Sequence, residues 1–434
     1  PGANREHGSP DSTTSPGTRS SGAGAFDNLD GGWPGTSGGA DRSGRLSLEL
    51  RRIVRIIAAK GAVNMPYIHE LHGWPEVTWD EKVLSGTLVS VRHRQGRLLG
   101  RMEALGFELR GGANLNALTE EVVKSTAIEG ERLDALEVRS SIARRLKLDA
   151  AGLPRPGREV EGVVEMMLDA TSNCEEPLSK ERLFGWHAAL FPAGRSGMGR
   201  IAVGRWRTDE AGPMQVVSGP VGKERVHFQA PSAERLEGEM ERFLGWFNGP
   251  SGVDPVLKAG VAHFRFVTIH PFDDGNGRIA RAIADMALSR ADGTKERFYS
   301  MSAAIEAERK EYYRRLEFAQ RGPLDITDWL AWFLGCLGRS IESAGNTLGS
   351  VLAKAEFWQR IAPHPIHERQ RKVLNRMLDG FEGRLTTSKY ARIAKCSADT
   401  ALRDIQDLLE WGVLAKNPGG GRSTSYMLAP SGSA

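Results

Sequence analysis

From residue 78 onward, apolar side chains recur every three to four positions, which is the spacing of amphipathic helices. In the first such stretch, Leu84, Leu88 and Val91 share a face, with basic residues between the apolar ones. After the break expected at Gly111 and Gly112, the same period predicts helices at residues 115–125, 136–146, 158–173, 179–191, 234–247, 254–269, 277–289, 304–319 and 326–345. We therefore predict an all-α core.

One segment departs from the helical period. Residues 205–231 are rich in β-branched residues and glycine, and "SGPVGK" separates two short runs of strand-forming residues. This pattern predicts a β-hairpin with strands near residues 214–217 and 225–228.

Beyond residue 363 the order of elements changes. Helices are expected over residues 368–381, 388–395 and 397–412, with a short strand at 384–387 and two strands around a glycine-rich tip at 413–428. That order looks like a winged helix-turn-helix, so we predict a small separate domain at residues 363–434.

The charge of this C-terminal part leaves its partner open. Residues 365–434 hold 11 Lys and Arg against 7 Asp and Glu, an excess that permits contacts to DNA phosphates. The expected recognition helix favours a protein partner instead, because its acidic residues outnumber Arg403: Asp399, Asp404, Asp407 and Glu410.

Composition and charge exclude several classes of protein. A content of 40% hydrophobic and 26% charged residues with a net charge of +4 is ordinary for a globular protein. The three cysteines are far apart, which argues against a zinc ribbon or disulfide framework and favours a reducing, cytoplasmic setting. No run approaches the roughly 18 apolar residues of a membrane span, so no membrane association is expected.

The N-terminal stretch has a different composition. Half of the first 44 residues are Gly, Ser or Pro, which bury too little apolar surface to offset the entropy of ordering. We predict a disordered low-complexity extension over residues 1–64, with Met65 resembling a natural beginning.

The segment "HPFDDGNGRIAR", residues 270–281, concentrates polar chemistry directly after an apolar helix. Pro271 cannot continue that helix, and it restricts His270 to an extended or turn backbone. Gly275 and Gly277 leave room for backbone N–H groups where the next helix starts. Such a helix N-terminus binds phosphate through its free N–H groups and its dipole.

The charged residues of this segment suit a polyphosphate. Arg278 and Arg281 can project on one side of the helix, where an anion between them would relieve their repulsion. Asp274 is the expected Mg²⁺ ligand, because Mg²⁺ on a polyphosphate takes one carboxylate plus phosphate oxygens and waters. Asp273 is expected to face solvent. His270 could accept a proton from an incoming hydroxyl group near neutral pH.

A purely structural interpretation stays open from the residues alone. The glycines could form an ordinary turn between helices, and Arg281 could pair with Asp285 four residues on. His187 and His263 show no ligand-like spacing and are expected to be core or surface histidines.

Residues 270–281 match the Fic family signature, His-x-Phe-x-Asp/Glu-Gly-Asn-Gly-Arg-x-x-Arg, at every specified position. The resemblance extends over most of residues 65–345. It implies a Fic-type helical bundle whose usual activity moves AMP from ATP to a Ser, Thr or Tyr hydroxyl group of a target protein. The hairpin near 214–228 corresponds to the family's flap, which aligns the target by β-augmentation. Fic relatives often form dimers, so the resemblance also allows a homodimer.

The resemblance assigns a role to each residue of the signature. His270 is the general base, and Phe272 holds the loop. The remaining roles are an Mg²⁺ ligand at Asp274, an anion hole at Gly275, Asn276 and Gly277 assisted by Arg278, and a γ-phosphate contact at Arg281.

A second resemblance concerns "STAIEGERL", residues 125–133. Ser125, Glu129 and Gly130 fit the inhibitory helix of many Fic proteins, Ser/Thr-x-x-x-Glu-Gly/Asn. The Glu129 carboxylate would pair with Arg281 and occupy the place that the γ-phosphate needs. These assignments imply an N-terminal helical module with the inhibitory helix at 65–150 and a Fic catalytic core at 151–350.

The sequence thus predicts a cytoplasmic, self-inhibited protein adenylyltransferase that depends on Mg²⁺ and ATP. One alternative enzyme removes AMP from a modified protein, with Glu129 orienting a water molecule. An alternative from another class is a nucleotide-responsive DNA-binding regulator, in which the C-terminal domain reads DNA.

Overall fold

The computed structural model describes residues 66–148, 150, 152–197, 199–219, 223–378, 384–418 and 424–429. The predicted N-terminal extension, residues 1–64, and the glycine-rich tip of the last hairpin lie outside these residues. Contacts divide the chain into two units, Pro1–Ala344 and Gly345–Ala434. The division falls inside one long helix, α12 (Thr327–Ile361).

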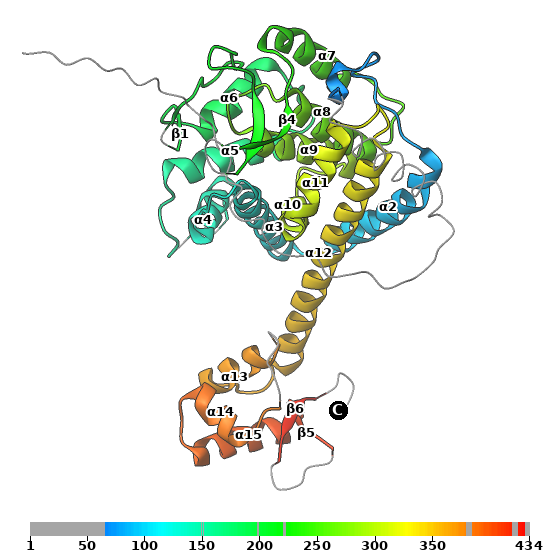
Figure 1. Cartoon of the computed structure of the whole chain (residues 1–434). Helices are drawn as coiled ribbons and strands as arrows, with labels where there is room; N and C mark the ends of the chain where they lie inside the picture. The colour runs from blue at the N-terminus through cyan, green and yellow to red at the C-terminus, as the bar shows by residue number, and fades with distance from the viewer. Residues whose placement is uncertain are drawn as a thin grey trace, which may run out of the picture. The chain divides into compact units, whose positions relative to one another are not determined.

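The first unit is a bundle of helices, as predicted (Figure 1). Before α12 its helices are η1 (Ile68–Glu70), α2 (Glu81–Glu103), α3 (Phe107–Ile128), α4 (Ala135–Arg145), α5 (Arg158–Ser172), α6 (Lys180–Leu190), η2 (Ala233–Arg235), α7 (Leu236–Asn248), α8 (Pro255–Ile269), α9 (Asn276–Asp292), α10 (Met301–Ala307) and α11 (Arg309–Gln320).

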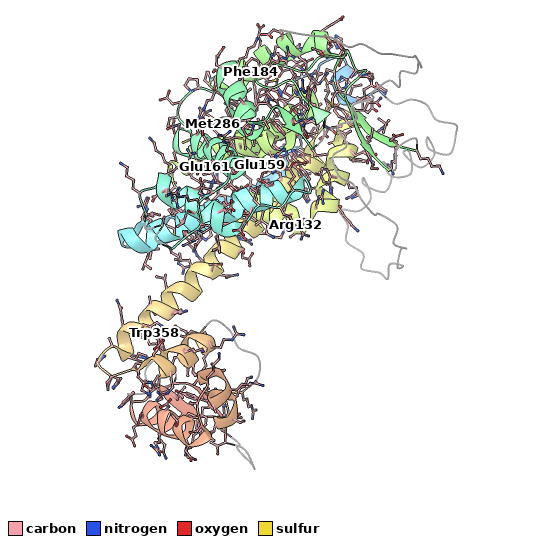
Figure 2. The ribbon with its side chains drawn as sticks, turned by 90° about the vertical axis from the view of Figure 1, so that its left-hand side faces the viewer. Arg132, Glu159, Glu161, Phe184, Met286 and Trp358 are labelled. Carbon is pink, nitrogen blue, oxygen red and sulfur yellow. The ribbon has the colours of Figure 1, made fainter. Side chains whose placement is uncertain are left out.

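Helices α8 and α9 pack side by side at the centre of this unit. Val261 and Phe264 on α8 and Ile283 on α9 are almost fully buried, which confirms the inward faces expected for both helices. Burying a side chain of this size stabilises a fold by about 1.5–3 kcal/mol. Helices α5 and α6 cover α9, and Figure 2 labels residues on these three helices.

Two helix boundaries differ from the prediction. Gly111 and Gly112 lie inside α3 rather than before it, and a Cβ at Gly111 would come within 3.3 Å of the Leu148 side chain. Close packing against Leu148 explains a glycine in mid-helix. The single helix expected over 304–319 is two helices, because Glu308 leaves the helical region at φ −117° and ψ 29°.

The predicted hairpin is present and is called the flap below. Strands β3 (Gln215–Ser218) and β4 (Arg225–Gln229) run antiparallel, with Gln215 opposite Gln229 and Ser218 opposite Arg225. A bulge between Val216 and Val217 shifts the register. A smaller antiparallel pair, β1 (Arg195–Ser196) and β2 (Gly199–Arg200), was not predicted.

The second unit has its own core, in which Val373, Tyr390 and Ile405 are fully buried. It contains α13 (Glu368–Leu378), α14 (Thr387–Ala394), α15 (Ala398–Glu410) and the antiparallel strands β5 (Leu414–Lys416) and β6 (Tyr426–Leu428). The strand expected at 384–387 is a single bridge from Leu385 to Tyr426. Among the described residues, no helix combines the length and the apolar character that a membrane crossing requires.

Candidate active site

The loop at residues 270–275 joins α8 to α9 through two left-handed residues. His270 ends α8 at φ 52° and ψ 58°. Of the extended and turn backbones expected before proline, it therefore adopts a turn. Gly275 precedes α9 at φ 80°. A Cβ there would lie 2.9 Å from Phe191 Cε2, so both the backbone angle and the contact require glycine.

Phe272 anchors this loop in the core. Its ring is fully buried and stacks on the His187 ring at a centroid distance of 4.2 Å. The side chain of Asn276 closes the loop, because its Oδ1 accepts from Phe272 N at 3.0 Å and its Nδ2 donates to Phe272 O at 2.8 Å. The Asn276 amide is therefore engaged within the loop, and only its backbone N–H faces the start of α9.

The His270 imidazole is oriented as a proton acceptor. Its Nδ1 lies 3.2 Å from the Val267 carbonyl, which can only accept, so Nδ1 carries the hydrogen and Nε2 keeps a lone pair. Burial lowers the pKa of His270 to about 4, although its side chain remains partly exposed. The neutral imidazole is thus the dominant form at neutral pH.

Two buried residues that the motif does not include hold the loop. Arg207 donates from Nε to the His270 carbonyl at 2.8 Å and from Nη2 to Pro231 O at 2.5 Å. His187 Nδ1 accepts from Gly204 N at 3.2 Å, so its Nε2 carries the hydrogen and donates to Asp274 O at 3.2 Å.

Sequence reasoning missed both roles. His187 was expected to have no more than a core or surface position, and it is fully buried. The apolar context of "FGWHAALF" was the one available signal for a hydrogen-bonded interior histidine. The sequence around Arg207 shows its pair with Asp209, two residues on, but not the two backbone carbonyls that it holds, which lie 24 and 63 residues away.

The two loop aspartates differ in surroundings. Asp273 does not simply face solvent as expected, because its Oδ2 accepts from Ala202 N at 2.8 Å and the residue is partly buried. Asp274 accepts from Ser196 Oγ and, through Oδ1, from Gly275 N at 2.5 Å. Its carboxylate is partly exposed beside the start of α9.

Asp274 suits an Mg²⁺ ion whose other ligands are mainly phosphate oxygens and waters. The described residues contain no group of three or more His, Cys, Asp or Glu side chains able to hold a metal by themselves. Mg²⁺ in phosphate sites commonly uses one carboxylate together with phosphate oxygens and waters. One partly exposed carboxylate next to the free N–H groups at the start of α9 fits that donor set.

The first turn of α9 forms what we call the anion cradle, the backbone N–H groups of Asn276, Gly277 and Arg278. N–H groups in the first turn of a helix have no acceptor within it, and the helix dipole places partial positive charge there. Arg281 Nη1 and Arg278 Nε are buried without a hydrogen-bond partner among the described residues. Buried donors left unpaired at a helix N-terminus favour an anionic ligand.

The carboxylate of Glu129 lies at this cradle. Glu129 Oε1 is 2.7 Å from Arg281 Nη2, and a Cβ added to Gly277 would overlap that carboxylate. Ser125 supports the pair, because Arg281 Nε donates to Ser125 Oγ at 2.8 Å and Nη2 donates to Ser125 O at 2.8 Å. The alternative pairing of Arg281 with Asp285 is wrong, since Asp285 pairs with Arg297 at 2.6 Å.

Glu129 is positioned by the end of α3. It is the C-cap residue of that helix, and Gly130 follows at φ 89°, a left-handed turn that suits glycine. The Tyr313 hydroxyl on α11 lies 3.2 Å from Ile128 O and 3.5 Å from Glu129 Oε2. Ser125, Glu129 and Gly130 thus meet Arg281 and the cradle from a segment about 150 residues away.

A second acidic residue, which was not expected from the sequence, lies at the site. Glu131 Oε2 lies 2.8 Å from Arg278 Nη1, while the Arg278 guanidinium also stacks over the Phe191 ring at 5.1 Å. Each of the two arginines of the motif therefore pairs with a carboxylate from the segment that follows α3.

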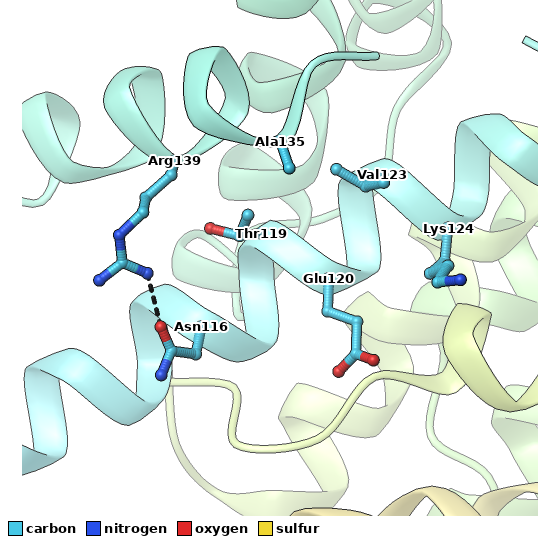
Figure 3. Close-up of a pocket in the computed structure, with 7 residues that line it drawn as sticks. All are labelled: Asn116, Thr119, Glu120, Val123, Lys124, Ala135 and Arg139. Carbon is cyan, nitrogen blue, oxygen red and sulfur yellow. Dashed lines mark hydrogen bonds between the residues drawn. The ribbon is translucent and has the colours of Figure 1, made fainter. Parts of the chain in front are cut away.

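A cavity of about 350 Å³ lies between α3 and α4 (Figure 3). Asn116, Glu120 and Lys124 of α3 line it, and Arg139 of α4 donates to Asn116 Oδ1 across it. None of the residues that line it belongs to the loop or the cradle. This cavity is therefore separate from the site described above.

Comparison with known proteins identifies two parts of the chain. Residues 177–288 match the Fic/DOC family, and residues 67–148 match a domain of unknown function (DUF4172). The chain is 29% identical over 209 residues to "Protein adenylyltransferase fic-1" of Caenorhabditis elegans, which covers 47% of this chain and 37% of the relative. It is 34% identical over 105 residues to "Protein adenylyltransferase Fic" of Culex quinquefasciatus, 24% of this chain and 19% of the relative.

The match thus spans little more than a third of the nematode relative's length. Among solved structures, a Fic family protein from Desulfovibrio desulfuricans aligns with 83% of this chain and 100% of its own at a TM-score of 0.48 and 20% identity. Fic-1 from C. elegans aligns with 63% of this chain and 75% of its own at a TM-score of 0.43 and 21% identity. The motif at 270–281 lies inside residues 177–288, the part of the chain that matches the Fic/DOC family.

Proposed function

We propose that this protein transfers AMP from ATP to a hydroxyl side chain of a target protein and that its own Glu129 inhibits this transfer. The main support for this proposal is the position of the Glu129 carboxylate, which lies against Gly277 and Arg281 at the N-terminus of α9. A carboxylate bound there supports an anion-binding role for the cradle. The names of the curated relatives, protein adenylyltransferases, support ATP as the source of that anion.

The chemistry follows from the residues of the loop. The cradle N–H groups and Arg278 bind the phosphates, and Arg281 binds the γ-phosphate once Glu129 has left it. His270 Nε2 takes the proton of the acceptor hydroxyl as its oxygen attacks the α-phosphorus, and pyrophosphate leaves. Asp274 would hold Mg²⁺, which supplies positive charge against the phosphate oxygens when bound.

Inhibition follows from competition for two guanidinium groups. Glu129 on Arg281 and Glu131 on Arg278 satisfy the donors that a nucleotide would otherwise use. Both arginines are buried, but the Glu129 side chain is 28% exposed and that of Glu131 is 52% exposed, so water screens the Glu131 pair more. We therefore propose that Glu129 is the principal inhibitory residue and Glu131 a weaker second one.

The test compares variants with labelled ATP, Mg²⁺ and a lysate as the source of acceptors. Glu129→Gly should raise AMP transfer at least tenfold, and Glu131→Gln should give a smaller increase. His270→Ala in the Glu129→Gly background should abolish transfer to the lysate proteins. Glu137→Gln, in the first turn of α4, is the matched control and should leave transfer unchanged. If Glu129→Gly gives no gain on any acceptor, including the chain itself, the inhibitory role of Glu129 is wrong.

Removal of AMP is the alternative for the same site, because Glu129 beside Tyr313 could hold a water molecule. A pre-modified protein distinguishes the two directions. Transferase action predicts that Glu129→Gly gains activity with ATP. Removal of AMP predicts that the same variant loses its ability to release AMP, because the residue that orients the water is gone.

The partner of the second unit stays a prediction. One observation bears on it: Asp404, counted above against DNA binding, is buried within the unit and is 4% exposed. The outward positions of α15 include Arg403 and Gln406 as well as Asp399. The acidic character of the outward face is thus weaker than the sequence suggested.

A further inference from the structure

Ser218, His227 and Glu317 form a chain of hydrogen bonds that the nucleotide site does not use. Ser218 Oγ lies 2.6 Å from His227 Nε2, and His227 Nδ1 lies 2.8 Å from Glu317 Oε2. The three residues come from β3, β4 and α11 respectively. All three are partly exposed, so reactants can reach them.

The direction of these hydrogen bonds follows from the chemistry of the partners. The Glu317 carboxylate can only accept, so Nδ1 of a neutral His227 must carry the hydrogen. Nε2 then has a lone pair, and the Ser218 hydroxyl must donate to it. A hydroxyl, a base and a carboxylate that orients the base are the arrangement that activates a nucleophilic serine.

The histidine ring is held in this orientation from several sides. Arg225 Nη2 contacts Glu317 Oε1 at 2.9 Å, which fixes the carboxylate. Arg321, the residue after α11, holds the backbone of β4. It donates from Nε to His227 O at 2.9 Å and from Nη2 to Val226 O at 3.0 Å. These contacts tie β4 to the C-terminal half of α11 and its following residue.

The flap is also tied to the nucleotide site. Tyr313, which contacts Glu129, precedes Glu317 by one turn of α11, a rise of about 6 Å. On the other side, Arg207 donates both to Pro231 O, just beyond β4, and to the carbonyl of His270. The flap is therefore tied to α11 near Ser218 and, at the opposite end of the hairpin, to the loop that carries His270.

We propose that Ser218 is an acceptor of AMP within this chain, a modification site served by His227 as its own base. The inference rests on the proposed function, since the cradle must deliver the nucleotide. Ser218 Oγ forms the new bond to the α-phosphorus of ATP, and the bond from that phosphorus to the pyrophosphate oxygen breaks. The hydroxyl proton passes to His227 Nε2, and pyrophosphate leaves. The cradle supplies the donors for the phosphate oxygens, so the flap needs none of its own.

The test uses the full chain with Glu129→Gly, ATP and Mg²⁺, followed by mass spectrometry of its peptides. AMP should appear on Ser218, and Ser218→Ala should remove that site. His227→Gln should slow labelling of Ser218 by roughly 10²-fold or more, the usual effect of losing a general base. Glu317→Gln should slow it less, because the ring stays in place with a weaker partner.

Three controls separate chemistry from folding and from the function itself. Ser85→Ala, on α2, should leave the labelling of Ser218 unchanged. The flap variants should keep the parent's thermal midpoint and its affinity for ATP.

AMP on other residues with Ser218 unmodified would overturn the inference while leaving the proposed function intact. No AMP on the chain or on any added protein would overturn the proposed function instead.

Discussion

Gly275 and Gly277 cannot carry side chains for different reasons. Gly275 combines a left-handed backbone with a contact to the Phe191 ring, and both belong to the rigid interior. At Gly277 the obstacle is the end of the Glu129 side chain. The first glycine therefore shapes the loop, whereas the second leaves the space that the Glu129 carboxylate occupies.

Gly275→Ala should destabilise the first unit by about 1–3 kcal/mol, the usual cost of a strained backbone position, and should weaken ATP binding. Denaturant unfolding and nucleotide titration measure the two effects. Gly238→Ala is the matched control, because a Cβ in that turn of α7 meets open space. It should raise stability by about 0.5–1 kcal/mol. Equal effects of the two substitutions would contradict the assigned role of Gly275.

At the scale of elements, the site joins the end of one helix to the beginning of another. The C-terminus of α3 carries Glu129, and the N-terminus of α9 carries the cradle. The partial charges of helix ends favour this arrangement, because a carboxylate sits at the positive end of α9 and a guanidinium lies near the negative end of α3. A shift of α3 along α9 would therefore weaken both contacts together.

His187 links α6 to the loop and gives the first unit a dependence on pH. Burial lowers the pKa of His187 to about 4, from an ordinary value of 6.5. The unfolded chain thus binds more protons than the folded one between these values. The contribution of His187 to the free energy of unfolding is complete above about pH 6.5 and is lost as the pH falls towards 4.

His187→Gln should flatten this dependence by up to about 1.4 kcal/mol per pH unit within that window. Urea unfolding at a series of pH values is the measurement. His93→Gln, an exposed position on α2, should keep the parent's slope. Some slope should remain in the His187 variant, because burial also lowers the pKa of His263 and His270. An unchanged slope in His187→Gln would contradict the assignment of this pH dependence to His187.

At the scale of the whole molecule, the two units have separate cores and should unfold in separate steps. Asp404 on α15 accepts from Tyr390 Oη of α14 at 3.1 Å and from Arg369 Nε of α13 at 3.3 Å. Asp404→Ala should leave the buried Tyr390 hydroxyl unpaired and lower the stability of the second unit by about 1–3 kcal/mol. Calorimetry should show one transition shifted and the other unchanged. Glu410→Ala, at the exposed end of α15, is the control, and a shift of both transitions would contradict independence.

Much of the fold was predictable because it depends on local periodicity. The helical bundle, the flap and the order of elements in the second unit follow from apolar spacing, proline and glycine. The errors concern helix boundaries: Gly111 packs against Leu148 inside α3, and the backbone angles of Glu308 divide one expected helix into two. The roles of His187 and Arg207 were not predictable, because the loop that they hold is 87 and 63 residues away in the sequence.

The sequence alone determined the chemistry available at residues 270–281, because the identity and spacing of these residues are local properties. It also marked Ser125, Glu129 and Gly130 as a candidate segment. Only the tertiary structure decided that the Glu129 carboxylate meets Arg281 rather than water and that Asp285 is engaged by Arg297. It alone placed Glu131 on Arg278 and aligned Ser218, His227 and Glu317. Contacts between distant segments depend on how the helices pack, and packing is a property of the whole fold.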